Sequence, residues 1–207
     1  MNTLSKQQRL QAIRDINRLH YKHSVWSYFP TPPAVIRQLI NHADLSDGLN
    51  VLEPSAGKGA IARKIYELWD CTIHCVEKNA DFSKLLKLFG YQVIGQDFSL
   101  LKPKPLYDRV VANPPFDCQM THLPLMYQWL KPAGKMVTVA NACFLEKNKQ
   151  RYKAEEFNNH MGAGRLYHQF FKWLDVTNAK VMRLPAGSFA TASRTTNVET
   201  VLITVTK

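Results

Sequence analysis

The tetrapeptide Asn113-Pro114-Pro115-Phe116 follows an apolar run, residues 110–112, that has the character of a buried strand. Two consecutive prolines fix φ and remove two backbone donors, so the chain leaves this strand in a stiff turn. Such a turn holds an amide side chain, carbonyl oxygens and an aromatic ring in a fixed relation. Together they can hold a planar amino group, because the oxygens accept its hydrogens and the ring stacks on its face. A rigid turn over a buried phenylalanine is the simpler interpretation, and the rest of the chain decides between the two.

A second candidate lies in the turn Glu53-Pro54-Ser55-Ala56-Gly57-Lys58-Gly59, which follows a short apolar strand. Its glycines let the backbone approach a ligand closely. The G-x-G-x-x-G spacing of dinucleotide loops is missing, and the carboxylate at the strand end would repel a pyrophosphate. A ligand that carries positive charge therefore fits this turn better.

Acidic residues also follow the next two predicted strands. Glu77 lies where an acidic side chain can bind both hydroxyls of a ribose. Asp97 and Phe98 lie where a carboxylate can accept from an exocyclic amine while a ring packs on a purine. A cationic amino acid, a ribose and an adenine together describe S-adenosylmethionine. For each carboxylate taken alone, the capping of a following helix is a reasonable alternative role.

The remaining pattern predicts an α/β scaffold that would position these side chains. Strands are expected at residues 49–52, 72–76, 91–94, 107–112, 135–140, 181–184 and 198–205. Helices are expected between them, including 60–69, 81–89, one that Thr31 caps, and 123–130, stopped by Pro132 and Gly134. This alternation favours a mainly parallel sheet covered on both faces. Ligands bind such sheets at the carboxyl ends of strands, so the residues that follow the strands should share one site.

Length and composition predict one globular domain spanning residues 1–207. The N-terminus lacks the apolar core of a signal peptide and no stretch is long enough to span a bilayer, so a cytoplasmic protein is expected. The net charge of +11 favours nucleic acid as the partner. Cys71 and Cys75 are interpreted as flanking a predicted buried strand and lack zinc-site spacing, so they are expected to be reduced core residues, and no metal is expected.

The ordered set of motifs resembles the class I S-adenosylmethionine-dependent methyltransferases, in particular those that methylate the exocyclic nitrogen of adenine in DNA. The resemblance covers roughly residues 26–140 and the last two strands. It implies cofactor motifs at Glu53 to Gly59, at Glu77 with Lys78, and at Gln96-Asp97-Phe98, with Phe29-Pro30-Thr31-Pro32 closing over the methionine part of the cofactor. Asn113 to Phe116 matches the catalytic motif [DNS]-P-P-[FYW]. The family also implies a Rossmann-like, seven-stranded sheet of order 3-2-1-4-5-7-6, with the seventh strand antiparallel.

A mechanism follows from the resemblance. The Asn113 side-chain oxygen and the Pro114 carbonyl would accept the two hydrogens of the amine and stabilise its developing charge. Phe116 would stack on a base flipped out of the duplex. No general base or metal is required before attack, and much of the rate would come from positioning.

Three segments are candidates for substrate recognition: the basic helical segment 1–25, a helix-rich insertion at 141–180, and the loop 185–197. Individual candidates for substrate contact are Lys147, Lys149, Arg151 and Arg194. The aromatic residues of the insertion either stack on bases or form an amphipathic cover on the sheet. In its small size and its motifs, the chain resembles compact adenine methyltransferases encoded by phages and other mobile elements.

Other substrates are compatible with the same motif. They are an RNA base (adenine N6 or guanine N2) and the side-chain amide of a protein glutamine. A hypothesis from a different class is a non-catalytic relative that binds nucleic acid or a protein partner. Phe116 and the positive charge favour nucleic acid over protein. The resemblance makes DNA the leading substrate and RNA its close rival. The sequence gives no indication of oligomeric state.

Overall fold

The computed structural model describes residues 29–142, 163–190 and 198–207, together with Gln7, Gln11, Arg14 and Leu145. Most of the expected N-terminal helical segment lies outside the described residues, as do the four candidates for substrate contact, Lys147, Lys149, Arg151 and Arg194.

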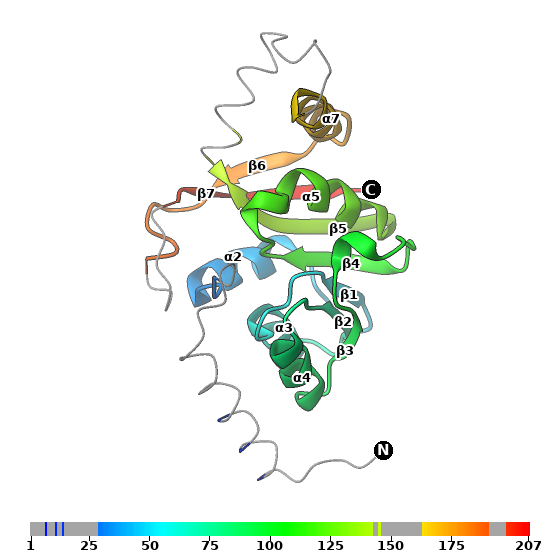
Figure 1. Cartoon of the computed structure of the whole chain (residues 1–207), viewed down its shortest axis with the longest axis vertical. Helices are drawn as coiled ribbons and strands as arrows, with labels where there is room; N and C mark the ends of the chain where they lie inside the picture. Colours follow the sequence, from blue (N-terminus) through cyan, green and yellow to red (C-terminus); the bar gives the residue numbers. More distant parts are fainter. Residues whose placement is uncertain are drawn as a thin grey trace.

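Seven strands form one sheet of order β3-β2-β1-β4-β5-β7-β6 (Figure 1). The strands are β1 (Asn50–Glu53), β2 (Thr72–Val76), β3 (Gln92–Gly95), β4 (Tyr107–Ala112), β5 (Leu130–Asn141), β6 (Lys180–Arg183) and β7 (Thr200–Thr206). The pairs from β3 to β5 are parallel, whereas β7 is antiparallel to both β5 and β6. The expected strand order and the antiparallel seventh strand are therefore confirmed.

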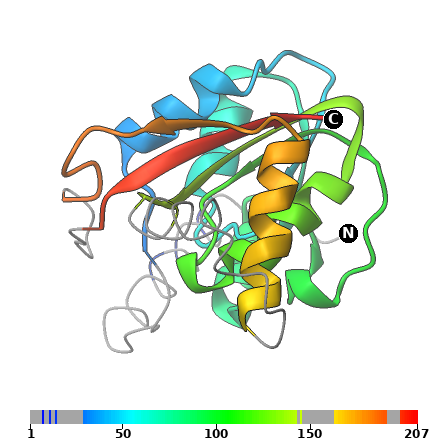
Figure 2. The same ribbon diagram turned by 90° about the horizontal axis from the view of Figure 1, so that it is seen from above.

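Helices cover both faces of this sheet (Figure 2). They are α2 (Pro33–His42), α3 (Ala60–Leu68), α4 (Ala80–Leu88), α5 (Gln119–Gln128) and α7 (Ala163–Val176), with 3-10 turns η1 (Phe98–Leu100) and η2 (Phe116–Cys118). Side chains alternate between the faces along each strand. In β4, Val111 joins the core cluster under α2 and α3, and Val110 joins the cluster under α5 and α7.

The largest difference from expectation lies around α5. The helix begins at Gln119, four residues before the apolar pattern starts. The pattern did not indicate this first turn, because the residues that it buries, Gln119 and His122, are polar. The helix ends at Gln128, and the chain enters β5 at Leu130. Pro132 and Gly134 therefore lie inside a strand and do not stop the helix, as had been expected. They accompany a shift in the β4–β5 register, and Ala133 between them has φ of 60°.

A second correction concerns the start of α2. Thr31 makes no side-chain capping bond to this helix, because the N-cap position belongs to Pro32 and Pro33 is the first helical residue. The N–H of Ile36 closes the first turn on the Pro32 carbonyl at 3.0 Å. The expected cap is wrong, and the Thr31 hydroxyl is left for another partner.

The described part of the insertion is a cover on the sheet. Phe170 and Phe171 of α7 are only 1% and 2% exposed, and their rings pack edge to face. Arg165 and Lys172 lie on the opposite, exposed face. The amphipathic interpretation therefore holds for this helix, and Phe170 and Phe171 are unavailable for base stacking.

Two smaller expectations can be compared with the structure directly. Cys71 and Cys75 are buried and unpaired, as expected for reduced core residues. In the part of the chain that the structure describes, no helix combines the length and apolar character needed to cross a membrane.

Candidate active site

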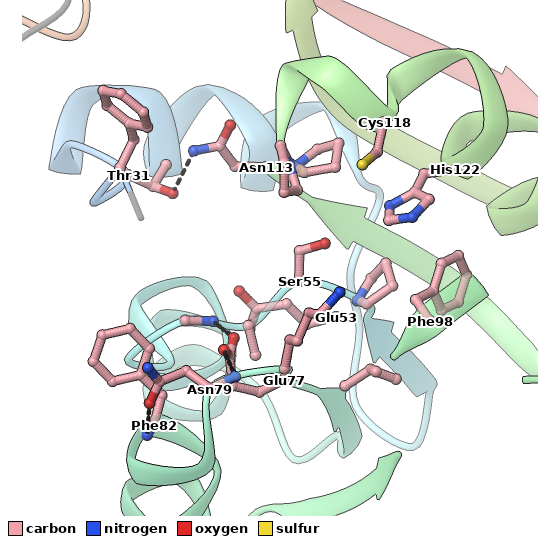
Figure 3. Close-up of a pocket in the computed structure, with 18 of the residues that line it drawn as sticks. Thr31, Glu53, Ser55, Glu77, Asn79, Phe82, Phe98, Asn113, Cys118 and His122 are labelled. Atoms are coloured by element: carbon pink, nitrogen blue, oxygen red, sulfur yellow. Dashed lines mark hydrogen bonds between the residues drawn. The ribbon is translucent and has the colours of Figure 1, made fainter. Parts of the chain in front are cut away.

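A pocket of about 770 Å³ opens at the carboxyl ends of β1, β2, β3 and β4 (Figure 3). It brings together residues that the sequence singled out from five separate segments. These are Phe29, Thr31, Glu53, Pro54, Ser55, Ala56, Gly57, Glu77, Lys78, Asp97, Phe98, Asn113, Pro114, Pro115 and Phe116. The expectation of a single site at the strand ends therefore matches the geometry.

Two expected cofactor contacts lie behind the pocket wall. Pro32 is buried and supports the start of α2, and it does not line the cavity. Gly59 is the N-cap of α3 in the left-handed region, at φ of 76°. A Cβ there would lie 2.7 Å from a methyl carbon of Leu86, so this glycine shapes the turn from behind.

Glu53 is the most deeply buried acid of the pocket, with 1% of its surface exposed. Its Oε2 accepts from the Ala62 N–H in the first turn of α3 at 2.8 Å, so the helix-capping role considered from the sequence is real. Burial raises the pKa of Glu53 well above its ordinary value, an effect that this bond opposes and the nearby Glu77 reinforces. A cation in the pocket would favour the ionised form and offset this cost.

Glu77 joins two loops of the pocket. Its Oε2 accepts from the Gly57 N–H at 2.6 Å and its Oε1 from the Asn79 N–H at 2.7 Å. Burial raises the pKa of Glu77, and these backbone donors partly oppose the shift. The carboxylate thus fixes the glycine turn after β1 against the loop after β2, at the place where ribose hydroxyls were expected.

Asp97 and Lys78 form an ion pair of 3.1 Å at the rim. Asp97 also accepts from the Ser99 N–H at 2.9 Å, which caps η1. The Lys78 hydrogen bond, followed by that of Ser99, lowers the pKa of Asp97, so this acid is ionised at neutral pH. Phe98, next to it, is 2% exposed and presents little of its ring to a ligand.

The Asn113 side chain is held by a contact across the pocket mouth. Its Nδ2 donates to the Thr31 Oγ at 3.0 Å, drawn as a dashed line in Figure 3. Pro114 is buried and Phe116 is half-buried against the core cluster under α2 and α3. One of the two N–H groups of the amide is therefore engaged, and the amide oxygen is the end that can accept from a ligand.

Sequence reasoning missed several residues of the pocket. His122 and Cys118 line it beside Phe98, and Phe189 lines it from the loop after β6. His122 was missed because an inward polar residue does not belong to an apolar stripe; its Nε2 lies 3.0 Å from the Ser99 hydroxyl, and burial lowers its pKa. Asn79 carried a readable signal, since it caps α4 by accepting from the Asp81 and Phe82 N–H groups.

The arrangement has two chemically different parts. The strand ends of β1 and β2 contribute a buried carboxylate, a half-buried carboxylate and a glycine turn, which suit a ligand with positive charge and vicinal hydroxyls. The end of β4 contributes an amide oxygen, a proline carbonyl and an aromatic ring, which suit a planar amine. The two parts share one cavity, so a bound ligand and an amine could be brought into contact there.

Comparison with known proteins found a curated sequence relative and solved structures of similar fold. No protein-family model matches the sequence. A protein-L-isoaspartate O-methyltransferase of Thermococcus sibiricus is 28% identical over 137 residues, covering 61% of each chain. The modification subunit of a putative type I restriction enzyme from Vibrio vulnificus aligns with a TM-score of 0.65 at 17% identity, over 97% of this chain and 49% of that one. A putative RNA methyltransferase from Pyrococcus horikoshii aligns at 0.61 and 16% identity, over 97% and 98% of the two chains.

These similarities establish the architecture. The chain has the Rossmann-like fold of the class I methyltransferases, and the sheet order agrees with it. It spans less than two thirds of the length of the curated relative and about half that of the modification subunit.

Proposed function

We propose that this chain is an S-adenosylmethionine-dependent methyltransferase whose substrate is the exocyclic N6 amine of adenine in DNA. The observation that carries the proposal is the Asn113 amide, held by Thr31 in the same cavity as Glu53 and Glu77. The fold supports it, because solved structures that share this fold include putative methyltransferases, and the curated relative is a protein-L-isoaspartate O-methyltransferase.

The pocket residues fit the cofactor. Buried Glu53 suits a cationic ligand, Glu77 would accept from ribose hydroxyls, and Asp97 would accept from the exocyclic amine of an adenine. Phe98, only 2% exposed, offers little of its ring for packing on that adenine. S-adenosylmethionine, when bound, supplies a sulfonium-linked methyl group. The glycine turn, held by Glu77 through Gly57, allows the close backbone approach that such a ligand needs.

The residues after β4 would prepare the amine. The Asn113 Oδ1 and the Pro114 carbonyl accept its hydrogens, which orients the nitrogen and stabilises positive charge as it develops there. Phe116 would stack on the base. In-line alignment of the amine with the methyl group would then supply much of the rate.

The net charge of +11 supports a nucleic-acid substrate, and the likeness to a restriction-enzyme modification subunit favours DNA. RNA is the nearest alternative, since a putative RNA methyltransferase matches over nearly its whole length. A role in substrate contact for Lys147, Lys149, Arg151 and Arg194, a single domain over residues 1–207, and a cytoplasmic location stay predictions from the sequence.

To test this, the protein is incubated with radiolabelled S-adenosylmethionine and, separately, with duplex DNA, single-stranded DNA, total RNA or a protein extract. Methylated nucleosides are then identified by mass spectrometry. Label recovered as N6-methyladenine in DNA is the expected result. Label in RNA or protein would replace the substrate and keep the chemistry. Absence of transfer to every pool, with cofactor binding intact, would count against catalysis.

Asn113→Ala is the first variant for this assay. We expect it to lower kcat by about a hundredfold or more, because one group that stabilises the transition state is removed. Calorimetry should find the affinity for S-adenosylmethionine nearly unchanged. Asn41→Ala, on the exposed side of α2, is the matched control and should change neither quantity. Undiminished turnover in Asn113→Ala would remove this residue from the mechanism.

A further inference from the structure

The bond between Asn113 and Thr31 links two rigid supports that are 82 residues apart in the sequence. Asn113 follows β4 and is succeeded by buried Pro114. Thr31 precedes Pro32, whose extended backbone leads into α2, and α2 is docked through Val35 and Leu39, which are 1% and 0% exposed. Neither end of the bond can shift without moving a buried element, so the distance between the two side chains is fixed by the fold.

This bond matters because an amide has two ends of nearly equal size. The oxygen can only accept and the nitrogen can only donate, so a half-turn of the side chain exchanges an acceptor for a donor. An Asn113 that presented its nitrogen to an amine would offer N–H against N–H. The chemistry proposed for the site therefore requires one of the two orientations and is blocked by the other.

A hydroxyl on its own does not select between them, because it can donate as well as accept. It selects the nitrogen when its own proton is directed to another acceptor. Among the residues that the structure describes, the Thr31 hydroxyl has the Asn113 amide as its hydrogen-bonding partner and no acceptor for its own proton. Thr31 lines the pocket, so a ligand in the pocket can supply that acceptor.

We propose that Thr31 is a positioning residue that sets the orientation of the Asn113 amide and that an acceptor group on the bound cofactor locks this orientation. The inference rests on the proposed function. The donors then run in one direction: the substrate amine donates to Asn113 Oδ1, Asn113 Nδ2 donates to Thr31 Oγ, and the Thr31 hydroxyl donates to the ligand. The carboxylate of S-adenosylmethionine has acceptor oxygens and no donor, which makes it the chemical group suited to the last step. Binding of the cofactor would thereby prepare the residue that receives the amine.

The first arm of the test does not depend on activity. The side-chain amide of Asn113 is observed by NMR in protein labelled with ¹⁵N-asparagine. Spectra are compared for the free protein, the protein with S-adenosylhomocysteine, which keeps the carboxylate, and the protein with 5′-methylthioadenosine, which lacks it. We expect one amide proton to exchange with solvent more slowly after S-adenosylhomocysteine binds, and much less change with 5′-methylthioadenosine. An equal response to both ligands would overturn the lock by the carboxylate.

Two substitutions separate the hydroxyl from the shape of Thr31. Thr31→Val keeps the shape and removes the hydroxyl, whereas Thr31→Ser keeps the hydroxyl. Thr31→Val should abolish the slowed amide exchange and lower kcat at saturating cofactor by about tenfold, the size of one ordinary hydrogen bond, while Thr31→Ser should retain most of both. Thr72→Val, at an exposed position in β2 away from the pocket, controls for the loss of a hydroxyl.

The outcomes for this inference and for the proposed function are distinguishable. Methyl transfer in the wild type with an unchanged kcat in Thr31→Val would overturn the positioning role and leave the methyltransferase standing. If no pool accepts methyl groups, the proposed function fails, and the NMR arm still decides the orientation. An Asn113 amide signal that is the same in Thr31→Val as in the wild type would then overturn the inference.

Discussion

The carboxyl group of Glu53 accepts a hydrogen bond in the first turn of α3, and we propose that it also binds the cationic cofactor. In the absence of a cation, burial favours its protonated form, and Glu77 adds repulsion. A carboxyl whose pKa is raised on folding keeps its proton at a pH where the unfolded chain has released it. Its contribution to stability is present below the ordinary value of 4.5 and is lost as the pH rises through the higher value of the folded protein.

Glu53→Gln removes this titration and keeps an oxygen for the Ala62 N–H. We expect the ligand-free variant to unfold at a higher temperature than the wild type at neutral pH, with the difference vanishing below pH 4.5. Its affinity for S-adenosylmethionine should fall by about tenfold or more, since a charged acceptor is lost. Thermal unfolding across pH and calorimetry measure the two effects.

Glu67→Gln is the control for that prediction, because Glu67 lies exposed on α3 in a surface pair with Lys64. It should alter neither the pH profile nor the affinity. Parallel pH profiles for wild type and Glu53→Gln would contradict a raised pKa at this position.

At the scale of elements, the turn between β1 and α3 depends on its second glycine. Gly59 has a left-handed backbone and also faces a side chain, since a Cβ would lie 2.7 Å from Leu86, a fully buried residue of α4. Gly48 has a comparable φ of 81° but open space around it. Substitution of Gly48 therefore tests backbone strain alone, whereas substitution of Gly59 tests backbone strain together with the steric contact with Leu86.

Gly48→Ala should cost about 1–2 kcal/mol of unfolding free energy, the price of a left-handed alanine. Gly59→Ala should cost more, because Leu86 must also move, and it should weaken cofactor binding through the displaced turn. Chemical denaturation of both variants gives the comparison. Equal losses would mean that the contact with Leu86 imposes no constraint.

At the scale of the whole molecule, the chain carries a net charge of +11 and a pocket at the carboxyl ends of its parallel strands. Such a charge gives affinity for polyanions that counterion release makes dependent on salt. The proposed nucleic-acid substrate therefore has a physical signature that does not depend on turnover.

We expect binding to labelled duplex DNA, measured by fluorescence anisotropy, to weaken steeply as salt rises. The logarithm of the association constant should fall linearly with the logarithm of salt concentration, with a slope of about −0.9 for each phosphate neutralised. The same titration with single-stranded DNA and RNA ranks the substrates. A slope near zero on all three would argue against a nucleic-acid partner and favour a protein substrate.

Much of the architecture could be predicted from the sequence because the limits of helices and strands depend on neighbouring residues. The strands at Thr72–Val76 and Tyr107–Ala112 are as expected, because strand limits follow from apolar runs and the turn residues beside them. The sheet order came from resemblance in the order of motifs. Pro132 and Gly134 misled because such residues end helices in isolation. In the sheet, Leu130 and Lys135 on either side of them pair with β4, and Ala133 and Gly134 exchange backbone bonds with Lys207 just after β7.

The sequence by itself indicated that Glu53, Glu77, Asp97 and Asn113 lie at or just past the ends of parallel strands, and hence that they meet in one pocket, since parallel strands align their carboxyl ends. The tertiary structure alone decided which partners these side chains have. Asn113 with Thr31, Glu77 with Gly57 and the inward His122 depend on contacts between distant segments. The physical reason is range: periodicity reports on neighbours along the chain, whereas the direction of a hydrogen bond across a cavity is set by how the elements pack.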